Sequence, residues 1–399
     1  MDVVQEILQY NAGRDPERLQ LKYQRMRSDP FVFLRGACHL FYARLPKGGI
    51  FKSAPPVWCC GDLHLENFGS YKGQNRIAYF DLNDFDEAAL APATWDLVRL
   101  LTSLRVAAPS LQLEAADTED LCAALLAAYV QALHGGKAYW AEPQTAHGLV
   151  RKLLDGLRDR QRSAFLDSRT TTRGRKRKLR TDGRRALPVS DAQRAHVLAF
   201  MESFAATQHD PDFYRVIDVA RRIAGTGSLG VDRYVILVEG KGSPDGNYLL
   251  DLKQALPSSL VPHLKVKQPR WESEADRVVA VQRRVQAVSM AFLQPATLQG
   301  KPYVLRGLQP LEDRVTLDGG GLRLSDVRGV VSSMGQLTAW GHLRSAGRQG
   351  SAIADELIDY AGRSKWQAKL QDASREMAAQ NARDAALYNA AYDQGAFQL

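Results

Sequence analysis

The chain has 399 residues, and its 53 lysines and arginines against 44 aspartates and glutamates give a formal net charge of +9. Hydrophobic residues form 45% of the sequence and charged residues 24%, which excludes a wholly disordered, collagen-like or fibrous protein. A chain of this length can bury a large core without disulfide or metal support. Its four cysteines are too few for a disulfide framework and lack the spacing of a zinc site.

No segment of the sequence is expected to enter or cross a membrane. The N-terminal residues lack the apolar core of a signal peptide. No stretch reaches the roughly 18 consecutive apolar residues that a membrane-spanning helix needs. We therefore expect a cytoplasmic protein without a membrane partner.

Apolar periodicity and turn residues predict a mostly helical first part, a smaller β-rich part, and then helices again. The helices of residues 1–48 are expected to break at Asp29-Pro30. A strand that begins near Pro55 is expected to end in a polar loop, and the turn residues at 243–247 predict a hairpin. The remaining expectations, in chain order, are a strand at 76–82, helices within 92–133 and 137–200, strands within 213–255, a helix at 274–292, a strand at 301–310, and helices at 326–344 and 365–392.

The strongest functional signal is the sequence GDLHLEN at residues 61–67, which is followed by the acidic segment DLNDFDE at 81–87. Phosphoryl transfer needs a carboxylate that orients the acceptor hydroxyl, and oxygen ligands that hold Mg²⁺ against the phosphates. Asp62 fits the first role, and Asn67 and Asp84 fit the second, with Asp81 as a rival to Asp84. The alternative is a polar turn whose carboxylates only cap backbone groups.

A second signal is the glycine-rich sequence GTGSLG at residues 225–230. In a dinucleotide-binding fold such a loop opens a helix, whereas here an apolar strand follows it. A glycine loop between two strands is typical of kinases, where backbone N–H groups cover the phosphates. Lys253 lies in the next predicted strand, where burial is costly unless an anion such as a phosphate pairs with it. The alternative is an edge-strand lysine that points to solvent.

These motifs resemble two groups of known proteins. GDLHLEN, together with NDFDEA at 83–88 and WDL at 95–97, resembles the catalytic and metal-binding segments of the protein-kinase-like superfamily, especially the aminoglycoside phosphotransferases. One departure is Cys60, which stands where that superfamily has a histidine. Over most of its length the chain also resembles the bacterial family DUF2252, through the segments FLRG at 33–36, GDLHLENFG at 61–69, NDFDEA at 83–88, GTGSLG at 225–230 and Leu252-Lys253.

The resemblance implies a phosphotransferase that uses ATP and Mg²⁺ on an unidentified hydroxyl acceptor. Asp62, His64 and Lys253 would be catalytic, Asn67 and Asp84 would hold the metal, and Asp96 would brace the catalytic loop. The nucleotide-binding residues would be Gly225, Thr226, Gly227, Ser228, Gly230, Lys253, Glu274 (with Glu272 as a rival) and Gln309. Arg35 is expected to form a structural ion pair rather than to bind phosphate.

The order of these motifs predicts an α+β, kinase-like two-lobe fold that is circularly permuted, because the catalytic loop precedes the glycine loop. Exposed linkers tolerate such reconnection when the ends of a domain lie close together. The predicted units are an N-terminal helical segment (1–48), the first part of a helical catalytic lobe (49–212), a β-rich nucleotide-binding lobe (213–318), and C-terminal helices that complete the helical lobe (319–399).

Residues 169–185 contain nine basic residues and one acidic residue, Asp182. A solvated flexible loop is the simpler interpretation, and an anionic partner is the functional one. The segment lacks the aromatic residues that single-stranded nucleic acid binding generally uses, so nucleic acid is the weaker candidate partner. Two other functions stay open: transfer of AMP to a protein, and a non-catalytic module that binds nucleotide or nucleic acid.

Overall fold

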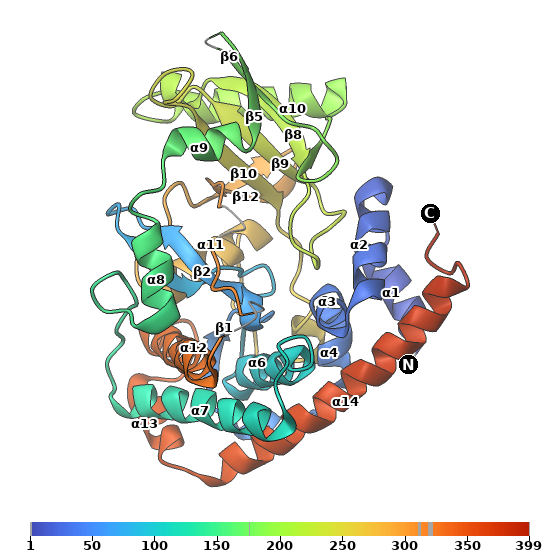
Figure 1. Cartoon of the computed structure of the whole chain (residues 1–399), viewed down its shortest axis with the longest axis vertical. Helices are drawn as coiled ribbons and strands as arrows, with labels where there is room; N and C mark the ends of the chain where they lie inside the picture. Colours follow the sequence, from blue (N-terminus) through green and yellow to red (C-terminus); the bar gives the residue numbers. More distant parts are fainter. Residues whose placement is uncertain (1, 175, 310–312, 318–321, 399) are drawn as a thin grey trace.

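The computed structural model describes residues 2–174, 176–309, 313–317 and 322–398. The fold is mixed α+β, with small sheets and a larger helical part. A six-stranded sheet occupies one end of the molecule, and the long helices pack together at the other end (Figure 1). Among the described residues, no helix combines the length and apolar character needed to cross a bilayer. All four cysteines are buried and free.

The N-terminal helices begin at side-chain caps that the sequence supplies. Asp2, Asp15 and Asp29 each accept hydrogen bonds from backbone N–H groups in the first turn of the next helix, which stabilises these helix starts. Asp29 also ends the preceding helix, so the predicted break at Asp29-Pro30 is confirmed. The helices of this region are α1 (Val3–Asn11), α2 (Pro16–Ser28), α3 (Pro30–Gly36), α4 (Cys38–Arg44) and α5 (Ile50–Ser53).

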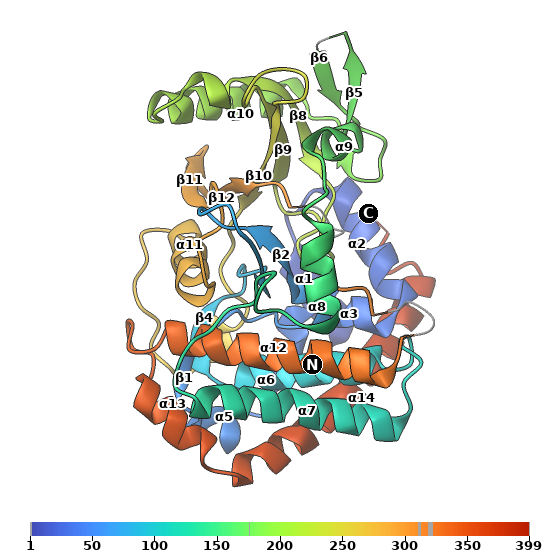
Figure 2. The same ribbon diagram turned by 60° about the vertical axis from the view of Figure 1, so that its left-hand side comes forward.

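The helical part is built around α6 (Thr94–Ala107), whose side chains are almost all buried. The long helix α14 packs against α6, and α12 packs closely against α7 (Figure 2). Gly335 permits that second contact, because a Cβ there would lie 2.2 Å from the carbonyl oxygen of Leu125. The other helices of this part are α7 (Ala115–His134), α8 (Gly148–Gly156), α12 (Leu324–Arg344), α13 (Ala354–Ala361) and α14 (Lys365–Asp393).

Two short antiparallel pairs of strands flank the acidic segments. The first pair is β1 (Pro56–Cys59) with β4 (Ala89–Pro92), and the second is β2 (Phe68–Lys72) with β3 (Ala78–Leu82). The acidic loop therefore begins where β1 ends, and the second acidic segment follows β3. This arrangement agrees with the predicted strand near Pro55 that ends in a polar loop.

The six-stranded sheet is antiparallel throughout. The helix α10 (Asp191–Ala206) covers one face, where its Val197 and Met201 pack in a common core with Leu250 and Leu252 of β10. Because strand side chains alternate, Asp251 and Lys253 lie on the opposite face. In spatial order the strands are β11 (Gln294–Leu298), β12 (Lys301–Gly307), β10 (Tyr248–Gln254), β9 (Arg233–Val238), β8 (Val216–Arg222) and β7 (Ala186–Leu187).

Two sequence expectations change in detail, and a third agrees with the structure. The helix α11 (Glu274–Val285) ends earlier than the predicted 274–292, because the backbone becomes extended at Gln286. The six-stranded sheet includes β7 (Ala186–Leu187), and α10 (Asp191–Ala206) covers it. Both lie before residue 213, where the predicted β-rich unit begins. The predicted hairpin turn at 243–247 joins the antiparallel neighbours β9 and β10.

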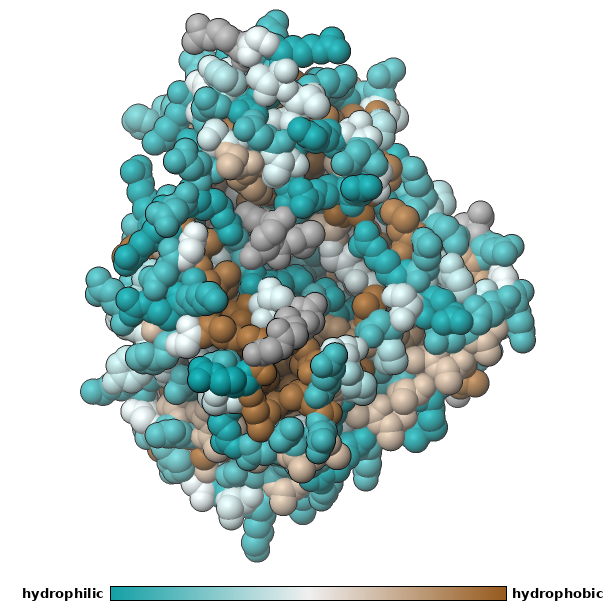
Figure 3. All heavy atoms as spheres, viewed as in Figure 1, coloured by the Kyte–Doolittle hydropathy of each residue, from teal (hydrophilic) through white to brown (hydrophobic). Residues whose placement is uncertain are grey.

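The basic segment at 169–185 is a β-hairpin rather than an irregular loop. Its strands, β5 (Thr170–Arg173) and β6 (Lys176–Leu179), pair in antiparallel register, and Arg175 lies outside the described residues. Arg177 is 4% exposed and donates to the carboxylates of Asp167 and Asp245 at 2.6 and 2.8 Å. Other basic side chains of the hairpin face solvent, in the hydrophilic upper end of the molecule (Figure 3). An anionic partner for them stays a prediction.

Candidate active site

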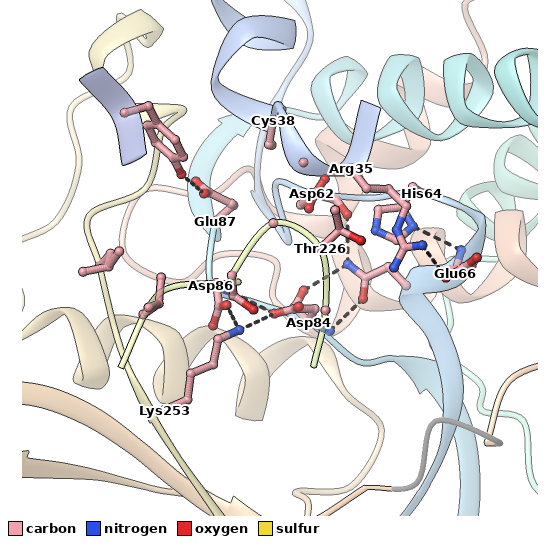
Figure 4. A pocket seen from close by; sticks show the side chains of 18 of the residues that line it. Arg35, Cys38, Asp62, His64, Glu66, Asp84, Asp86, Glu87, Thr226 and Lys253 are labelled. Atoms are coloured by element: carbon pink, nitrogen blue, oxygen red, sulfur yellow. Dashed lines mark hydrogen bonds and ion pairs between the residues drawn. The ribbon is translucent and has the colours of Figure 1, made fainter. Parts of the chain in front are cut away.

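One pocket collects most of the residues that the sequence singled out. It encloses about 870 Å³ of space that opens to solvent, and it lies between the sheet and the helical part. Figure 4 shows the labelled side chains converging on this space. The sequence-predicted residues that line it are Asp62, His64, Asn67, Asp84, Gly225, Thr226, Gly227, Ser228 and Lys253. Gly230, Glu274 and Gln309 do not line it.

The acidic loop leaves β1 through Gly61, whose φ of +87° favours glycine. A Cβ at this position would also lie 2.2 Å from the carbonyl oxygen of Glu87. Asp96, at the start of α6, accepts the N–H groups of Cys60 and Gly61 at 2.9 and 3.0 Å. The expected bracing of the loop by Asp96 is therefore confirmed.

Asp62 is oriented by a buried guanidinium. Arg99 Nε donates to Asp62 Oδ1 at 2.8 Å, and Arg99 Nη2 donates to the same oxygen. The Arg99 side chain is 0% exposed, whereas that of Asp62 is 21% exposed. One side of the carboxylate is thus held in place, and the Oδ2 side remains directed towards the glycine loop, 3.9 Å from where a Cβ of Gly227 would lie.

Asn67 connects the two acidic segments. Its Oδ1 accepts the N–H of Asp84 at 2.7 Å, and its Nδ2 donates to the carbonyl oxygens of Asp62 and Asp84 at 3.0 and 3.2 Å. These hydrogen bonds hold Asp62 and Asp84 at the same side of the pocket. Oδ1 keeps a second lone pair for another partner, so the role of Asn67 as a metal ligand stays a prediction.

Lys253 reaches across the pocket from β10 to the second acidic segment. Its Nζ forms an ion pair with Asp86 and lies 3.9 Å from Asp84 Oδ1. Burial tends to raise the pKa of Asp84, but Lys253, Arg306 and Arg233 outweigh burial and lower it. Burial and the charge of Asp84 raise the pKa of Asp86. The two carboxylates therefore form one strongly interacting pair with the ammonium group between them and the sheet.

A cluster of arginines surrounds Asp251, two residues before Lys253 on β10. Asp251 is 0% exposed and accepts from Arg233 at 2.8 and 2.6 Å, while Arg222 and Arg306 lie 2.8 and 3.3 Å from its Oδ2. Three guanidiniums thus surround one carboxylate. This cluster leaves an excess of positive charge on the face of the sheet that carries Lys253.

The glycine loop follows β8 and folds over Asp62. Gly225 and Gly230 have φ values of +71° and +85°, which favour glycine at both ends of the loop. Arg14 and Lys22, from the N-terminal helices and their connection, donate to the carbonyl oxygen of Gly227 at 2.8 and 3.0 Å. The N-terminal segment therefore holds the loop down, a contact that the motif alone did not reveal.

The comparison with known proteins adds one finding. Residues 14–391 match the family described as an uncharacterized protein conserved in bacteria, DUF2252. The chain belongs to the DUF2252 family. No curated protein and no solved structure matches it.

In this DUF2252 protein, His64 is a buried member of the acidic loop. Its Nδ1 accepts the N–H of Glu66 at 3.1 Å. Burial, together with Arg35, Arg99 and Arg314, holds the pKa of His64 well below its usual range. His64 is therefore neutral at neutral pH, and it lines the pocket without adding positive charge to it.

Two predicted nucleotide-binding residues have other contacts. Glu274 pairs with Arg277, three residues along the same helix, at 2.6 Å rather than with Lys253. Gln309 donates to the carbonyl oxygen of Ser70 at 3.4 Å, away from the pocket lining. In this structure Lys253 pairs with Asp86 instead of Glu274, and a nucleotide-binding role for Glu274 stays a prediction.

Of the two rival metal ligands in the second acidic segment, only Asp84 lines the pocket. Asp81 is 1% exposed and faces the helical part, where it lies 3.2 Å from Arg344 and accepts the N–H of Ala287 at 3.1 Å. Burial raises its pKa, with Arg344 acting in the opposite direction. Asp81 is accordingly a buried structural group of the DUF2252 fold.

A second group of ligand-type atoms lies beneath the acidic loop. Those of Cys59, Asp96 and His342 are buried and within 4.8 Å of one another. Both oxygens of Asp96, however, already accept backbone N–H groups. Burial also raises the pKa of the Cys59 thiol, which disfavours the thiolate that a metal would need. The arrangement fits a structural cluster better than a metal centre.

Several residues in or beside the pocket were not predicted from the sequence. Asp86 and Glu87 belong to the NDFDEA segment, so counting its carboxylates would have found them. Glu87 accepts from Tyr10 at 3.0 Å and from the N–H of Ser259 at 2.6 Å, and burial raises its pKa. Arg99 had no local signal, because its role depends on how α6 packs beneath the loop.

Proposed function

We propose that this protein is an ATP- and Mg²⁺-dependent phosphotransferase that acts on a hydroxyl acceptor. The observation that supports this proposal best is the single pocket shared by Asp62, Asp84, the glycine loop and Lys253. Lys253 and its partner Asp86 are 167 positions apart in sequence, so local sequence does not explain their meeting. A carboxylate pair that faces a buried lysine beneath a glycine loop provides opposite charges where phosphoryl transfer needs them.

In this proposal, Asp62 acts on the acceptor. The acceptor oxygen forms a bond to the terminal phosphorus of ATP, its proton passes to Asp62, and the bond to the ADP oxygen breaks. Arg99 keeps Asp62 in one orientation for that step, and Asp96 keeps the loop backbone in place. Positioning and fixed charges, rather than covalent catalysis by the protein, would supply the rate enhancement.

The nucleotide would bind between the sheet and the acidic segments. The backbone of residues 225–228 would cover the phosphates, and Lys253 would exchange its contact with Asp86 for a phosphate oxygen. Asn67 and Asp84 would hold Mg²⁺, and Asp86 adds a further carboxylate beside them, because Mg²⁺ prefers hard oxygen ligands. When bound, the ion would neutralise phosphate charge. Two adjacent carboxylates that share one lysine form a donor set that fits such an ion.

The order of elements supports a permuted kinase-like arrangement. The glycine loop lies between β8 and β9, Lys253 is on the next strand β10, and α11 follows before β11 and β12. The loop that contains Asp62 comes earlier in the chain, although kinase-like proteins have it after these strands. We therefore include a circularly permuted kinase-like fold in the proposal.

Nucleotide-dependent thermal stability tests the proposal directly. ATP with Mg²⁺ should raise the melting temperature, since a ligand at about 100 times its Kd stabilises the native state by about 2.7 kcal/mol. Asp84→Asn should lose the Mg²⁺-dependent part of the shift. Asp62→Asn should keep the shift but release no ADP with a panel of hydroxyl acceptors. The mass added to an acceptor distinguishes phosphoryl from adenylyl transfer.

As a matched control, Arg323→Gln removes an exposed arginine whose ion pair is with Asp326 of α12, three residues along the chain. It should leave both the shift and the turnover unchanged. A wild-type protein that no nucleotide stabilises, or an Asp62→Asn variant with full turnover, would contradict the proposal.

A further inference from the structure

Two arginines converge on one carboxylate at the side of the pocket next to Asp62. Arg35, near the end of α3, places Nη1 2.6 Å from Glu66 Oε2, and Arg314 places Nη1 2.7 Å from the same oxygen. All three residues line the pocket. Two guanidiniums against one carboxylate leave this side with one excess positive charge.

The cluster has capacity for a further anion. Arg35 Nε is buried and has no hydrogen-bond partner among the residues that the structure describes. The side chains of Glu66 and Arg314 are 40% and 34% exposed, so a solute can reach them. Because both guanidiniums approach the same oxygen of Glu66, the two cations repel one another across this site. A second anion would relieve that repulsion.

The cluster lies on the far side of Asp62 from the proposed nucleotide site. In Figure 4, Lys253 and Asp86 lie to one side of Asp84, while Arg35, His64 and Glu66 lie to the other. Asp62 and Thr226 are between the two groups. A molecule whose hydroxyl group reaches Asp62 can therefore contact the arginines without entering the space of the nucleotide.

We propose that Arg35 and Arg314 bind an anionic group, a phosphate or a carboxylate, on the acceptor whose hydroxyl group meets Asp62. This inference rests on the proposed phosphotransferase function and names the class of its acceptor. Polycationic acceptors such as aminoglycosides would meet the excess positive charge of this cluster, and like charges in an incompletely solvated pocket repel strongly. The acceptor is an acidic hydroxy compound.

Calorimetric titration with inorganic phosphate tests this site. The nucleotide site is first filled with a non-hydrolysable ATP analogue and Mg²⁺. Arg35→Gln should weaken phosphate binding by about tenfold or more, the worth of one charge-assisted hydrogen bond. Arg35→Lys, which keeps the charge, should retain part of the affinity. Glu66→Gln should strengthen binding, because it removes the carboxylate that competes with phosphate for both arginines.

The opposite signs of these two effects separate an anion site from a structural ion pair, in which both substitutions would weaken binding together. The control Arg323→Gln should change nothing. A nucleotide-induced melting shift in every variant shows that each one is folded. Phosphate that binds only when the nucleotide is absent, unchanged affinity in Arg35→Gln, or weaker binding in Glu66→Gln would each overturn the proposal.

The same titration without nucleotide distinguishes the two proposals. If no nucleotide stabilises the wild-type protein but phosphate binding depends on Arg35, the anion site stands and the phosphotransferase function fails. If the nucleotide binds and phosphate does not, the function stands and the acidic acceptor is wrong.

Discussion

The Nε atom of Arg99 lies 2.8 Å from the Oδ1 atom of Asp62. Arg99 belongs to α6, a helix whose side chains are almost all buried. The same guanidinium donates to the carbonyl oxygen of Leu34 at 3.0 Å, so α6 holds the acidic loop and α3 together. Burial alone would lower the pKa of Arg99, but the Asp62 carboxylate raises it, and the arginine stays charged. Asp62 therefore has a permanent cation on one side and the open pocket on the other.

Replacing Arg99 should impair both folding and turnover. Arg99→Gln leaves the partly buried Asp62 without its cation, which should cost about 3 kcal/mol of unfolding free energy in a urea titration. In the fraction that folds, kcat for ADP release should fall while the KM for nucleotide stays the same, because Arg99 positions Asp62 and does not contact the nucleotide. Arg99→Lys should recover stability more than kcat, since lysine keeps the charge but not the planar fork. An unchanged kcat would refute the positioning role.

The Mg²⁺ dependence of nucleotide binding should follow Asp84 and Asp86 and not Asp81. Asp84→Asn and Asp86→Asn should each raise the Mg²⁺ concentration needed for half-maximal nucleotide binding by about tenfold or more, because each removes a hard anionic ligand. Asp81→Asn should lower stability, since Asp81 is buried against Arg344, but leave the Mg²⁺ dependence unchanged. A titration of the melting temperature with MgCl₂ at fixed ATP separates the two outcomes. A Mg²⁺ response lost in Asp81→Asn would contradict this assignment.

Adding one methyl group to the glycine loop should disturb turnover more than stability. A Cβ at Gly227 would lie 3.1 Å from the carbonyl oxygen of Arg35 and 3.9 Å from Asp62 Oδ2, so Gly227→Ala should push the loop away from Asp62. We expect a higher KM for ATP and a lower kcat, with a stability change of about 1 kcal/mol or less. Gly48→Ala is the control, because a Cβ there meets nothing within 4 Å. Equal kinetics in the two variants would show that the loop does not act at this site.

The sequence predicts those parts of the site that depend on local chain geometry. Asp62 follows a strand and a glycine, and residues 225–228 form a loop between two strands, so short motifs were enough to identify them. Glu274 pairs with Arg277, one helical turn further on, a contact that spacing alone does not reveal. Lys253 pairs instead with Asp86, which lies 167 positions before it in the chain.

The missed residues depend on packing between distant elements. Lys22 reaches Gly227 only because the N-terminal helices lie against the glycine loop, and Arg99 reaches Asp62 only because α6 runs beneath the acidic loop. Similarly, the basic hairpin was expected to be a flexible loop because its composition is polar. In β6, exposed residues alternate with the buried Arg177 and Leu179. Arg177 can be buried because Asp167 and Asp245 pair with it, and the second of these contacts comes from a distant part of the chain.

Substituting His39 should stabilise the protein, and more so in acid. Both ring nitrogens of His39 are buried and lack hydrogen-bond partners among the described residues, while the ring stacks on Tyr10 at 3.9 Å. Burial, with Lys22, Arg14 and Arg99 nearby, holds the pKa of His39 well below its usual range.

The unfolded chain therefore takes up a proton on His39 below about pH 6.5 that the native state does not bind, so native stability falls as the pH decreases through this range. His39→Phe keeps the stacked ring and removes both unpaired nitrogens, so it should gain about 1 kcal/mol near neutral pH. The gain should grow at about pH 5, because the variant no longer loses stability through this group. Urea midpoints at the two pH values measure the effect, with the exposed His196→Phe on α10 as the control. A gain that does not increase in acid would show that another group controls the pH dependence.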